Sequence, residues 1–190
     1  RSLISRGSEM GARYTRDHAV SPDIMGYSMA GTIDALGEGV THYEIGDRVV
    51  SLSPHAEYSV RKATVDGPHG MAWVVALPDD VNWEAAPYYP LTSGSVAWVE
   101  AEEIGPTDTV VILGQGLVGS LMLQTMKANG NGYVIAVDAL DSRCEMAANM
   151  GADRVINAAE EDPVAAVRKL TNGVGAHLVV YAVGGPAGPR

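Results

Sequence analysis

The order of apolar and polar residues divides the chain into two halves. In the first half, short alternating runs between glycine-containing turns predict strands at 29–36, 47–52, 56–61 and 73–77. In the second half, apolar runs predict buried strands at 109–113, 133–137, 154–157 and 177–181. Segments with helical spacing lie between these strands, at 117–128, 141–150 and 163–170. The pattern therefore predicts a β-rich module followed by a module that alternates strand and helix.

Alternation of buried strands with helices is typical of a parallel sheet that has helices on both faces, so the fold class is α/β. We place one domain at 1–85 and the second at 86–190. The pair Asp141 and Ser142 is expected to cap the helix at 141–150, and Pro163 suits the first turn of the last helix.

Composition narrows the class of partner. Apolar residues make up 46% of the chain and charged residues 19%, as in ordinary globular proteins. The net charge of −10 repels phosphate backbones, which argues against nucleic acid. No apolar run approaches the ~18 residues of a membrane span, so no membrane partner is expected. The single cysteine, Cys144, cannot form an intrachain disulfide and fits a cytoplasmic protein.

Three glycines connect the strand at 109–113 to the helix that follows. Gly114 would permit the tight turn, Gly116 would let the backbone approach a pyrophosphate, and Gly119 would let the helix pack closely. Leu117 and Val118 open the helix, where free N–H groups attract an anion. The pattern predicts a dinucleotide site; the alternative is a glycine-rich turn without a ligand.

An acidic residue and a basic residue bear on which dinucleotide would bind. Asp138 ends the next strand, 19 residues after Gly119, where a carboxylate can accept hydrogen bonds from ribose hydroxyls and would repel a 2′-phosphate. Arg143 follows five residues later and either favours NADP, covers the adenine edge, or is a solvated helix arginine. With Asp138 present, NAD(H) is expected in preference to NADP.

Further segments occur in a recognisable order: Gly-Tyr-Ser-Met-Ala-Gly at 26–31, Gly-Asp-Arg-Val at 46–49, Ala-Glu-Tyr at 56–58, Leu-Pro-Asp-Asp at 77–80 and Pro-Leu-Thr-Ser-Gly at 90–94. With the glycine pattern, the chain resembles the medium-chain dehydrogenase/reductase family, the zinc-type alcohol dehydrogenase superfamily. The resemblance implies a partial GroES-like β-rich catalytic domain followed by a partial Rossmann doubly wound parallel sheet. The family is longer at both ends, so we expect both ends to be missing. The complete protein is expected to be a homodimer or homotetramer.

The catalytic zinc ligands of that family have no counterparts here. Arg6 stands at the position of a cysteine, Tyr27 at that of a histidine and Tyr89 at that of the third ligand. Arginine cannot ligate a cation, and neutral tyrosine is a poor zinc ligand. The four-cysteine structural lobe of the family is also missing. We expect a zinc-free member, with no metal site.

The same positions give the candidate catalytic residues. The resemblance places Arg6, Tyr27 and Tyr89 around one former metal site that faces the nicotinamide, with Ser8 close by. Either tyrosine could donate a proton to an alkoxide, and Ser8 could relay that proton outward. In the alternative, the tyrosines only fill the vacated space while Arg6 pairs with Glu9.

Several other polar residues have a structural alternative. The resemblance places the Ser93 hydroxyl near the nicotinamide, although Thr92 or Ser93 could also cap a helix. His55 is expected in a loop or at a strand end, His177 in a structural role, and Cys144 as a packed thiol.

Together these features predict a zinc-independent, NAD(H)-dependent oxidoreductase that transfers hydride between nicotinamide and a small alcohol or carbonyl substrate. Two alternatives remain open. One is a quinone or enoyl reductase of the same superfamily, which needs no zinc. The other is a non-catalytic NAD-binding sensor.

Overall fold

The computed structural model describes residues 1–9, 25–64 and 72–184. The chain forms two compact units, an N-terminal unit at Arg1–Pro90 and a C-terminal unit at Leu91–Arg190. The division falls inside helix α2 (Tyr89–Ala101), whose first two residues belong to the N-terminal unit.

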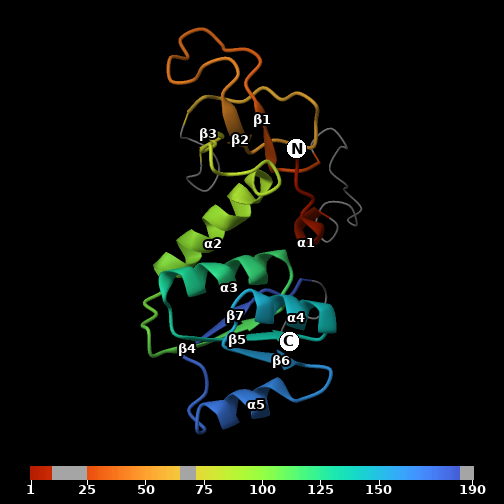
Figure 1. Cartoon of the computed structure of the whole chain (residues 1–190), viewed down its shortest axis with the longest axis vertical. Helices are drawn as coiled ribbons and strands as arrows, with labels where there is room; N and C mark the ends of the chain where they lie inside the picture. The colour runs from red at the N-terminus through yellow and green to blue at the C-terminus, as the bar shows by residue number, and fades with distance from the viewer. Residues whose placement is uncertain (10–24, 65–71, 185–190) are drawn as a thin grey trace. The chain divides into compact units, whose positions relative to one another are not determined.

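The N-terminal unit is built on an antiparallel sheet with the order β1-β2-β3 (Figure 1). Its elements are α1 (Arg6–Ser8), β1 (Met29–Thr32), β2 (Arg48–Ser51), β3 (Val74–Ala76) and the short 3-10 helix η4 (Ala86–Tyr88). Ala30, Val50 and Ala86 form its buried cluster, because β1 and η4 bring small side chains against β2. The expected β-rich module is therefore present in the described residues.

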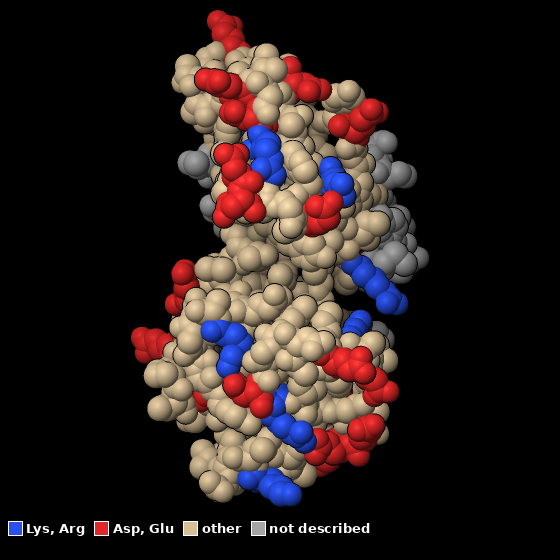
Figure 2. Space-filling view, viewed as in Figure 1, with Lys and Arg blue, Asp and Glu red and all other residues tan. Residues whose placement is uncertain are grey.

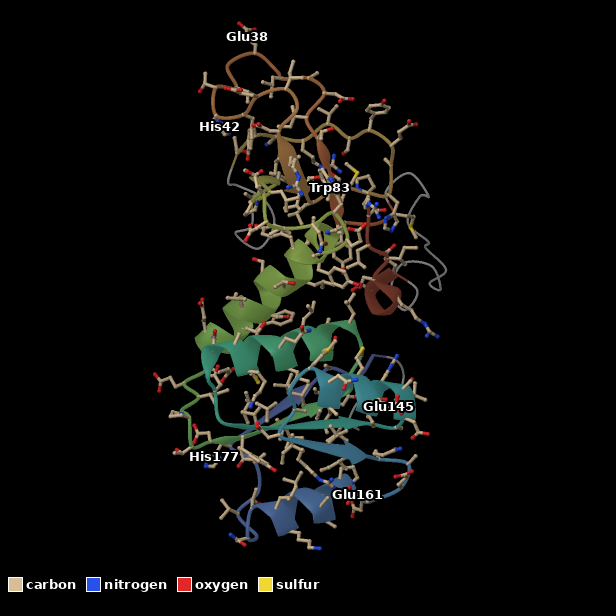
Figure 3. The ribbon with its side chains drawn as sticks, viewed as in Figure 1. Glu38, His42, Trp83, Glu145, Glu161 and His177 are labelled. Atoms are coloured by element: carbon tan, nitrogen blue, oxygen red, sulfur yellow. The ribbon has the colours of Figure 1, made fainter. Side chains whose placement is uncertain are left out.

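Arg48, in the Gly-Asp-Arg-Val segment, holds the turn that follows β3. Its Nη2 donates to the carbonyl oxygen of Val81 at 2.6 Å, and Nη1 donates to that of Asp79 at 3.1 Å. The guanidinium also lies 4.6 Å from the centre of the Trp83 ring, labelled in Figure 3. Because one side chain satisfies several carbonyls and stacks on an aromatic face, this arginine has a structural role.

The strand predicted at 56–61 is wrong. Those residues form irregular backbone, and the side chains of Tyr58 and Val60 are 71% and 93% exposed. Arg61 Nε donates to the carbonyl oxygen of Leu52 at 2.8 Å, which holds the segment locally. Alternating polarity gives a strand only where a neighbouring strand pairs with it, and among the described residues this segment pairs with none.

The C-terminal unit contains a four-stranded parallel sheet with the order β6-β5-β4-β7. Its strands are β4 (Thr109–Leu113), β5 (Tyr133–Asp138), β6 (Arg154–Asn157) and β7 (Leu178–Tyr181), and its helices after α2 are α3 (Leu117–Asn129), α4 (Asp141–Asn149) and α5 (Pro163–Leu170). Each predicted strand and helix of this half is confirmed within one residue at either end.

Helices cover both faces of this sheet, as Figure 1 shows for α3 and α4 on one side and α5 on the other. The strand residues facing the first side are Val110, Ile112, Val134 and Ala136, which pack with α3 and α4. The residues facing the other side are Val111, Ile135, Val137 and Ile156, which pack with α5. Neighbouring residues of a strand point to opposite faces, so the apolar runs supply two cores. The doubly wound prediction is confirmed.

Two helix starts differ in their capping. At α5, the side chain of Asp162 accepts a hydrogen bond from the Val164 N–H at 2.9 Å. At α4, the cap position is Leu140, and Asp141 is already helical, so the expected Asp-Ser cap is wrong. Asp141 Oδ1 instead accepts from Asn157 Nδ2 at 2.7 Å, which ties α4 to the end of β6.

Candidate functional site

A glycine turn joins β4 to α3 in the C-terminal unit. Gly114 has a φ of +89°, a backbone conformation that favours glycine. A side chain at Gly119 would overlap the carbonyl oxygen of Gly114, whereas one at Gly116 would meet no atom within 4 Å. Gly119 therefore permits close helix–strand packing, while Gly116 leaves open space beside the backbone.

The geometry of this turn fits a bound pyrophosphate. Gly116 caps α3, and the Ser120 N–H is bonded to the Gly116 carbonyl at 2.9 Å. The amides of Leu117, Val118 and Gly119 lie before Ser120 and have no intrahelical acceptor, and the helix dipole adds partial positive charge there. β4 also lies between β5 and β7, so the turn stands at the point where the strand order reverses, the usual position of a nucleotide in such sheets.

Asp138, at the end of β5, is bonded directly to this turn. Its Oδ2 accepts a hydrogen bond from the Gln115 N–H at 2.7 Å. Its Oδ1 accepts from the N–H groups of Ala139 at 2.8 Å and Leu140 at 3.1 Å. The residue is only 8% exposed, so the carboxylate fixes the glycine turn against the next strand from a sheltered position.

Arg143 supplies the cation beside this carboxylate, with Nη1 at 3.4 Å from Asp138 Oδ2. Burial raises the pKa of Asp138, but the hydrogen bonds from Gln115 and Leu140, the Arg143 charge and the Ala139 N–H together outweigh it and lower the pKa. Asp138 is therefore ionised at neutral pH. A ribose hydroxyl can replace the long Arg143 contact, because such a contact is weak.

The Cys144 thiol beside Asp138 and the His177 imidazole at the start of β4 both have structural contacts. Burial, followed by the negative charge of Asp138, raises the pKa of the Cys144 thiol, whose Sγ lies 3.6 Å from the Asp138 carbonyl oxygen. His177, labelled in Figure 3, accepts the Thr109 N–H on its Nδ1 at 2.9 Å. These contacts agree with a packed thiol and a histidine that fixes the start of β4.

The candidate catalytic residues of the N-terminal unit lie in different environments. Arg6 and Ser8 are exposed on α1, and Tyr27 is half-buried on the segment before β1. The two segments run side by side, since the Leu3 N–H donates to the Ser28 carbonyl at 3.2 Å. Tyr89 packs against the cluster of Ala30, Val50 and Ala86. Catalytic roles for these four residues stay predictions.

A carboxylate–imidazole contact beside α1 was missed by sequence reasoning. Glu9 is fully buried, and its Oε2 lies 2.9 Å from His55 Nε2. Its Oε1 accepts the Ser5 N–H at 2.7 Å. Both oxygens are thus engaged, and the suggested pairing of Arg6 with Glu9 is wrong. The two partners are 46 residues apart, so no local pattern could have joined them.

Ser93 lies inside α2, in its second turn, because the helix begins at Tyr89. The alternative that Thr92 or Ser93 caps this helix is therefore wrong. The predicted place of Ser93 near the nicotinamide stays a prediction.

The residues at the former ligand positions do not fit zinc, since Arg6, Tyr27 and Tyr89 offer none of its usual donors. Within 1–9, 25–64 and 72–184, no group of three or more His, Cys, Asp or Glu side chains could hold a metal ion.

The helices described for this chain are all too short or too polar to span a lipid bilayer. Figure 2 shows acidic and basic side chains interspersed on the visible face of the C-terminal unit.

Two family models match successive parts of the chain. Residues 6–81 match the alcohol dehydrogenase GroES-like domain, and residues 118–188 match the zinc-binding dehydrogenase family.

The chain is also similar to curated proteins and solved structures. It is 28% identical to the sorbitol dehydrogenase of Bacillus subtilis over 190 residues, covering 87% of this chain and 54% of that protein. The alcohol dehydrogenase of Thermus sp. ATN1 gives a TM-score of 0.69 at 26% identity, covering 86% of this chain and 56% of that one. Escherichia coli quinone oxidoreductase, solved with NADPH, gives 0.71 at 23% identity over 94% and 54%, a likeness of fold alone. The chain spans about half the length of the curated relatives it matches.

Proposed function

Because the chain belongs to the medium-chain dehydrogenase/reductase superfamily, we propose that the complete protein is an NAD(H)-dependent oxidoreductase that interconverts an alcohol and its carbonyl compound without zinc. The observation that carries the proposal is the ionised Asp138 carboxylate bonded to the glycine turn. The names of the relatives, sorbitol dehydrogenase and alcohol dehydrogenase, support the substrate class.

Each half of the chain would contribute a different task. In the C-terminal unit, the amides at Leu117 and Val118 would hold the pyrophosphate, and Asp138 would accept ribose hydroxyls. Bound nicotinamide supplies a carbon that accepts or donates hydride. In the N-terminal unit, a phenol of Tyr27 or Tyr89 would hydrogen-bond the substrate oxygen, the task that zinc performs elsewhere in the superfamily.

Asp138 also supports NAD(H) over NADP(H). Its carboxylate is negative at neutral pH, so a ribose 2′-phosphate would be placed beside a like charge. Arg143 already faces that carboxylate and offsets only part of its charge. The absence of zinc ligands at Arg6, Tyr27 and Tyr89 supports the zinc-independent reaction.

The test combines three measurements on the complete protein. Elemental analysis after purification without chelator should find less than stoichiometric zinc, and titration should give tighter binding of NADH than of NADPH. Nicotinamide absorbance should then report turnover of an alcohol or aldehyde. Turnover of quinones or enones alone would assign the reductase function instead, and NAD binding without any turnover would assign a sensor. One firmly bound zinc per chain would refute the zinc-independent reaction.

A further inference from the structure

Asn157, the last residue of β6, joins the two loops that follow β5 and β6. Its Nδ2 donates a hydrogen bond to Asp141 Oδ1 at 2.7 Å, and its Oδ1 accepts the Ala159 N–H at 2.9 Å. A carboxylate accepts and a backbone N–H donates, so these two partners fix which end of the amide carries the NH2 group. One half-buried side chain therefore holds both loops in place.

Both loops lie beside the carboxylate that is proposed to take up ribose hydroxyls. Asn157 is the register partner of Asp138 in the neighbouring parallel strand, as β5 and β6 run side by side in Figure 1. The Ala158 N–H also donates to the Asp138 carbonyl oxygen at 2.9 Å. Ligands of open α/β sheets bind outside the carboxyl ends of the strands, and both loops begin at that edge.

The loop after β5 also sets the direction of the Asp138 carboxylate. Asp138 Oδ1 accepts the N–H groups of Ala139 and Leu140, which are the two residues between Asp138 and Asp141. Leu140 is the cap residue of α4 and supplies no side-chain cap, whereas Asp141 is tied to Asn157. A displacement of Asp141 would therefore draw these N–H groups away from Oδ1 and let the carboxylate turn.

We propose that Asn157 is a positioning residue for the adenosine end of the dinucleotide. Through Asp141, it holds the loop at 138–141 in the path that directs the Asp138 carboxylate toward the ribose hydroxyls. The inference rests on the proposed function, because it takes NAD(H) as the ligand. It concerns the C-terminal unit by itself, since all three residues and the glycine turn belong to that unit.

The alternative is a bond with a structural role only. Such a bond would tie α4 to the end of β6, and its loss would lower the free energy of unfolding. The affinity of the folded protein for ligands that contain adenosine would then be unchanged. Binding and stability must therefore be measured on the same variants.

Asn157→Asp is the most direct test, because it removes the donor and places a second carboxylate against Asp141. In the complete protein, we expect this variant to bind NADH about 10-fold more weakly than the wild type. Asn157→Ala, which only removes the two hydrogen bonds, should lose about 3- to 10-fold. ADP-ribose contains the adenosine and the pyrophosphate but no nicotinamide, so its affinity should fall by the same factor in each variant. Calorimetric titration gives all these affinities.

The double variant Asp141→Asn/Asn157→Asp exchanges the donor and the acceptor without changing the net charge. The new amide can donate to the new carboxylate, which can still accept the Ala159 N–H. Both affinities should therefore return to within about twofold of the wild type, because the two substitutions act on one bond. Asn149→Asp is the matched control. It makes the same change of charge at an exposed position of α4 and should leave both affinities at their wild-type values.

The Tm of each variant is measured beside its affinities. Wild-type affinity for both ligands in folded Asn157→Asp or Asn157→Ala, with or without a lowered Tm, would overturn this inference and leave the proposed function standing. Weaker binding that the exchange does not restore would also overturn it, because the added charge rather than the lost bond would then be responsible. If Asn157→Asp does not fold, Asn157→Ala and the exchange decide the question. A wild-type protein that binds neither NADH nor ADP-ribose would overturn both.

Discussion

Asp138→Asn is expected to remove most of the preference for NADH over NADPH. The wild-type carboxylate is ionised and bonded to the glycine turn, so a 2′-phosphate on the adenosine ribose would lie beside a negative charge. Asparagine keeps the size of the side chain but not the charge. Arg143, which lies 3.4 Å from the carboxylate, then becomes available to the phosphate.

The expected magnitude follows from Coulomb's law and the local counter-charge. Two unit charges 4 Å apart interact by about 4 kcal/mol at an effective dielectric constant of ~20. Arg143 faces the same carboxylate and cancels part of the repulsion. A net penalty of roughly 1.5–3 kcal/mol remains, and at 1.4 kcal/mol per factor of ten it corresponds to about 10- to 100-fold weaker NADPH binding.

The substitution also has a local structural cost. Asparagine keeps one acceptor oxygen and places an NH2 group where the other was, so either the Gln115 N–H or the N–H groups of Ala139 and Leu140 lose their acceptor, and an unsatisfied buried donor costs about 1–3 kcal/mol. Urea denaturation must therefore show that the variant is folded at the temperature of the binding assay. Only the ratio of the two cofactor affinities, measured on folded protein, reports the charge effect.

Fluorescence titration of NADH and NADPH gives that ratio for the wild type and for two variants. Arg143→Gln is the matched control, because it removes the counter-charge and should widen the preference for NADH. Asp138→Asn should bring the ratio close to one. An unchanged ratio in Asp138→Asn, or a wild type that prefers NADPH, would refute the assignment of cofactor choice to this carboxylate.

Three further outcomes are expected. Gly119→Ala should lower the free energy of unfolding by about 3 kcal/mol, because the added methyl group would overlap the Gly114 carbonyl. Gly116→Ala should change the free energy of unfolding little, because a methyl group there would meet open space. Denaturant titration compares the two variants, and equal stabilities would contradict the packing argument. Steady-state kinetics of Tyr27→Phe and Tyr89→Phe should show kcat lowered by about 100-fold in at least one variant; near-wild-type activity in both would leave the tyrosines as packing. Burial raises the pKa of Asp153, but hydrogen bonds from Lys127 and Val134 and the charge of Lys127 lower it overall. The stabilisation from this carboxylate should therefore be present above its ordinary pKa of 3.8 and be lost as pH falls toward the lowered pKa. Asp153→Asn should weaken this acid sensitivity in urea titrations from pH 3 to 7, and an unchanged pH dependence of stability would contradict the assignment.

The C-terminal unit could be predicted from sequence because its signals are local. The apolar run at β4, the glycine turn and Asp138 follow one another along the chain, and each residue's role depends on near neighbours. The exception is helix capping, where Asp141 binds Asn157 across the unit instead of its own helix. A side chain with a stronger partner elsewhere does not follow the local preference.

The N-terminal unit depends more on contacts between distant residues. The alternating run at 56–61 looked like a strand, but only a paired neighbour could have made it one. Glu9 and His55 are far apart in the sequence, so no local pattern could show that they are in contact. Their contact depends on how the segment that carries His55 packs against Gly26. The glycine at position 26 was a detectable signal, although sequence alone could not show which ring it accommodates.

The sheltered state of Cys144 has a practical consequence for labelling. The chain holds one cysteine, and its thiol is largely protonated at neutral pH, because burial and the Asp138 charge raise its pKa. Maleimides react with thiolates, so a cysteine introduced at an exposed position such as Glu38 should react much faster than Cys144. A fluorophore or spin label could thus be attached at one chosen point of this chain without first mutating the native thiol, which packs beside Asp138.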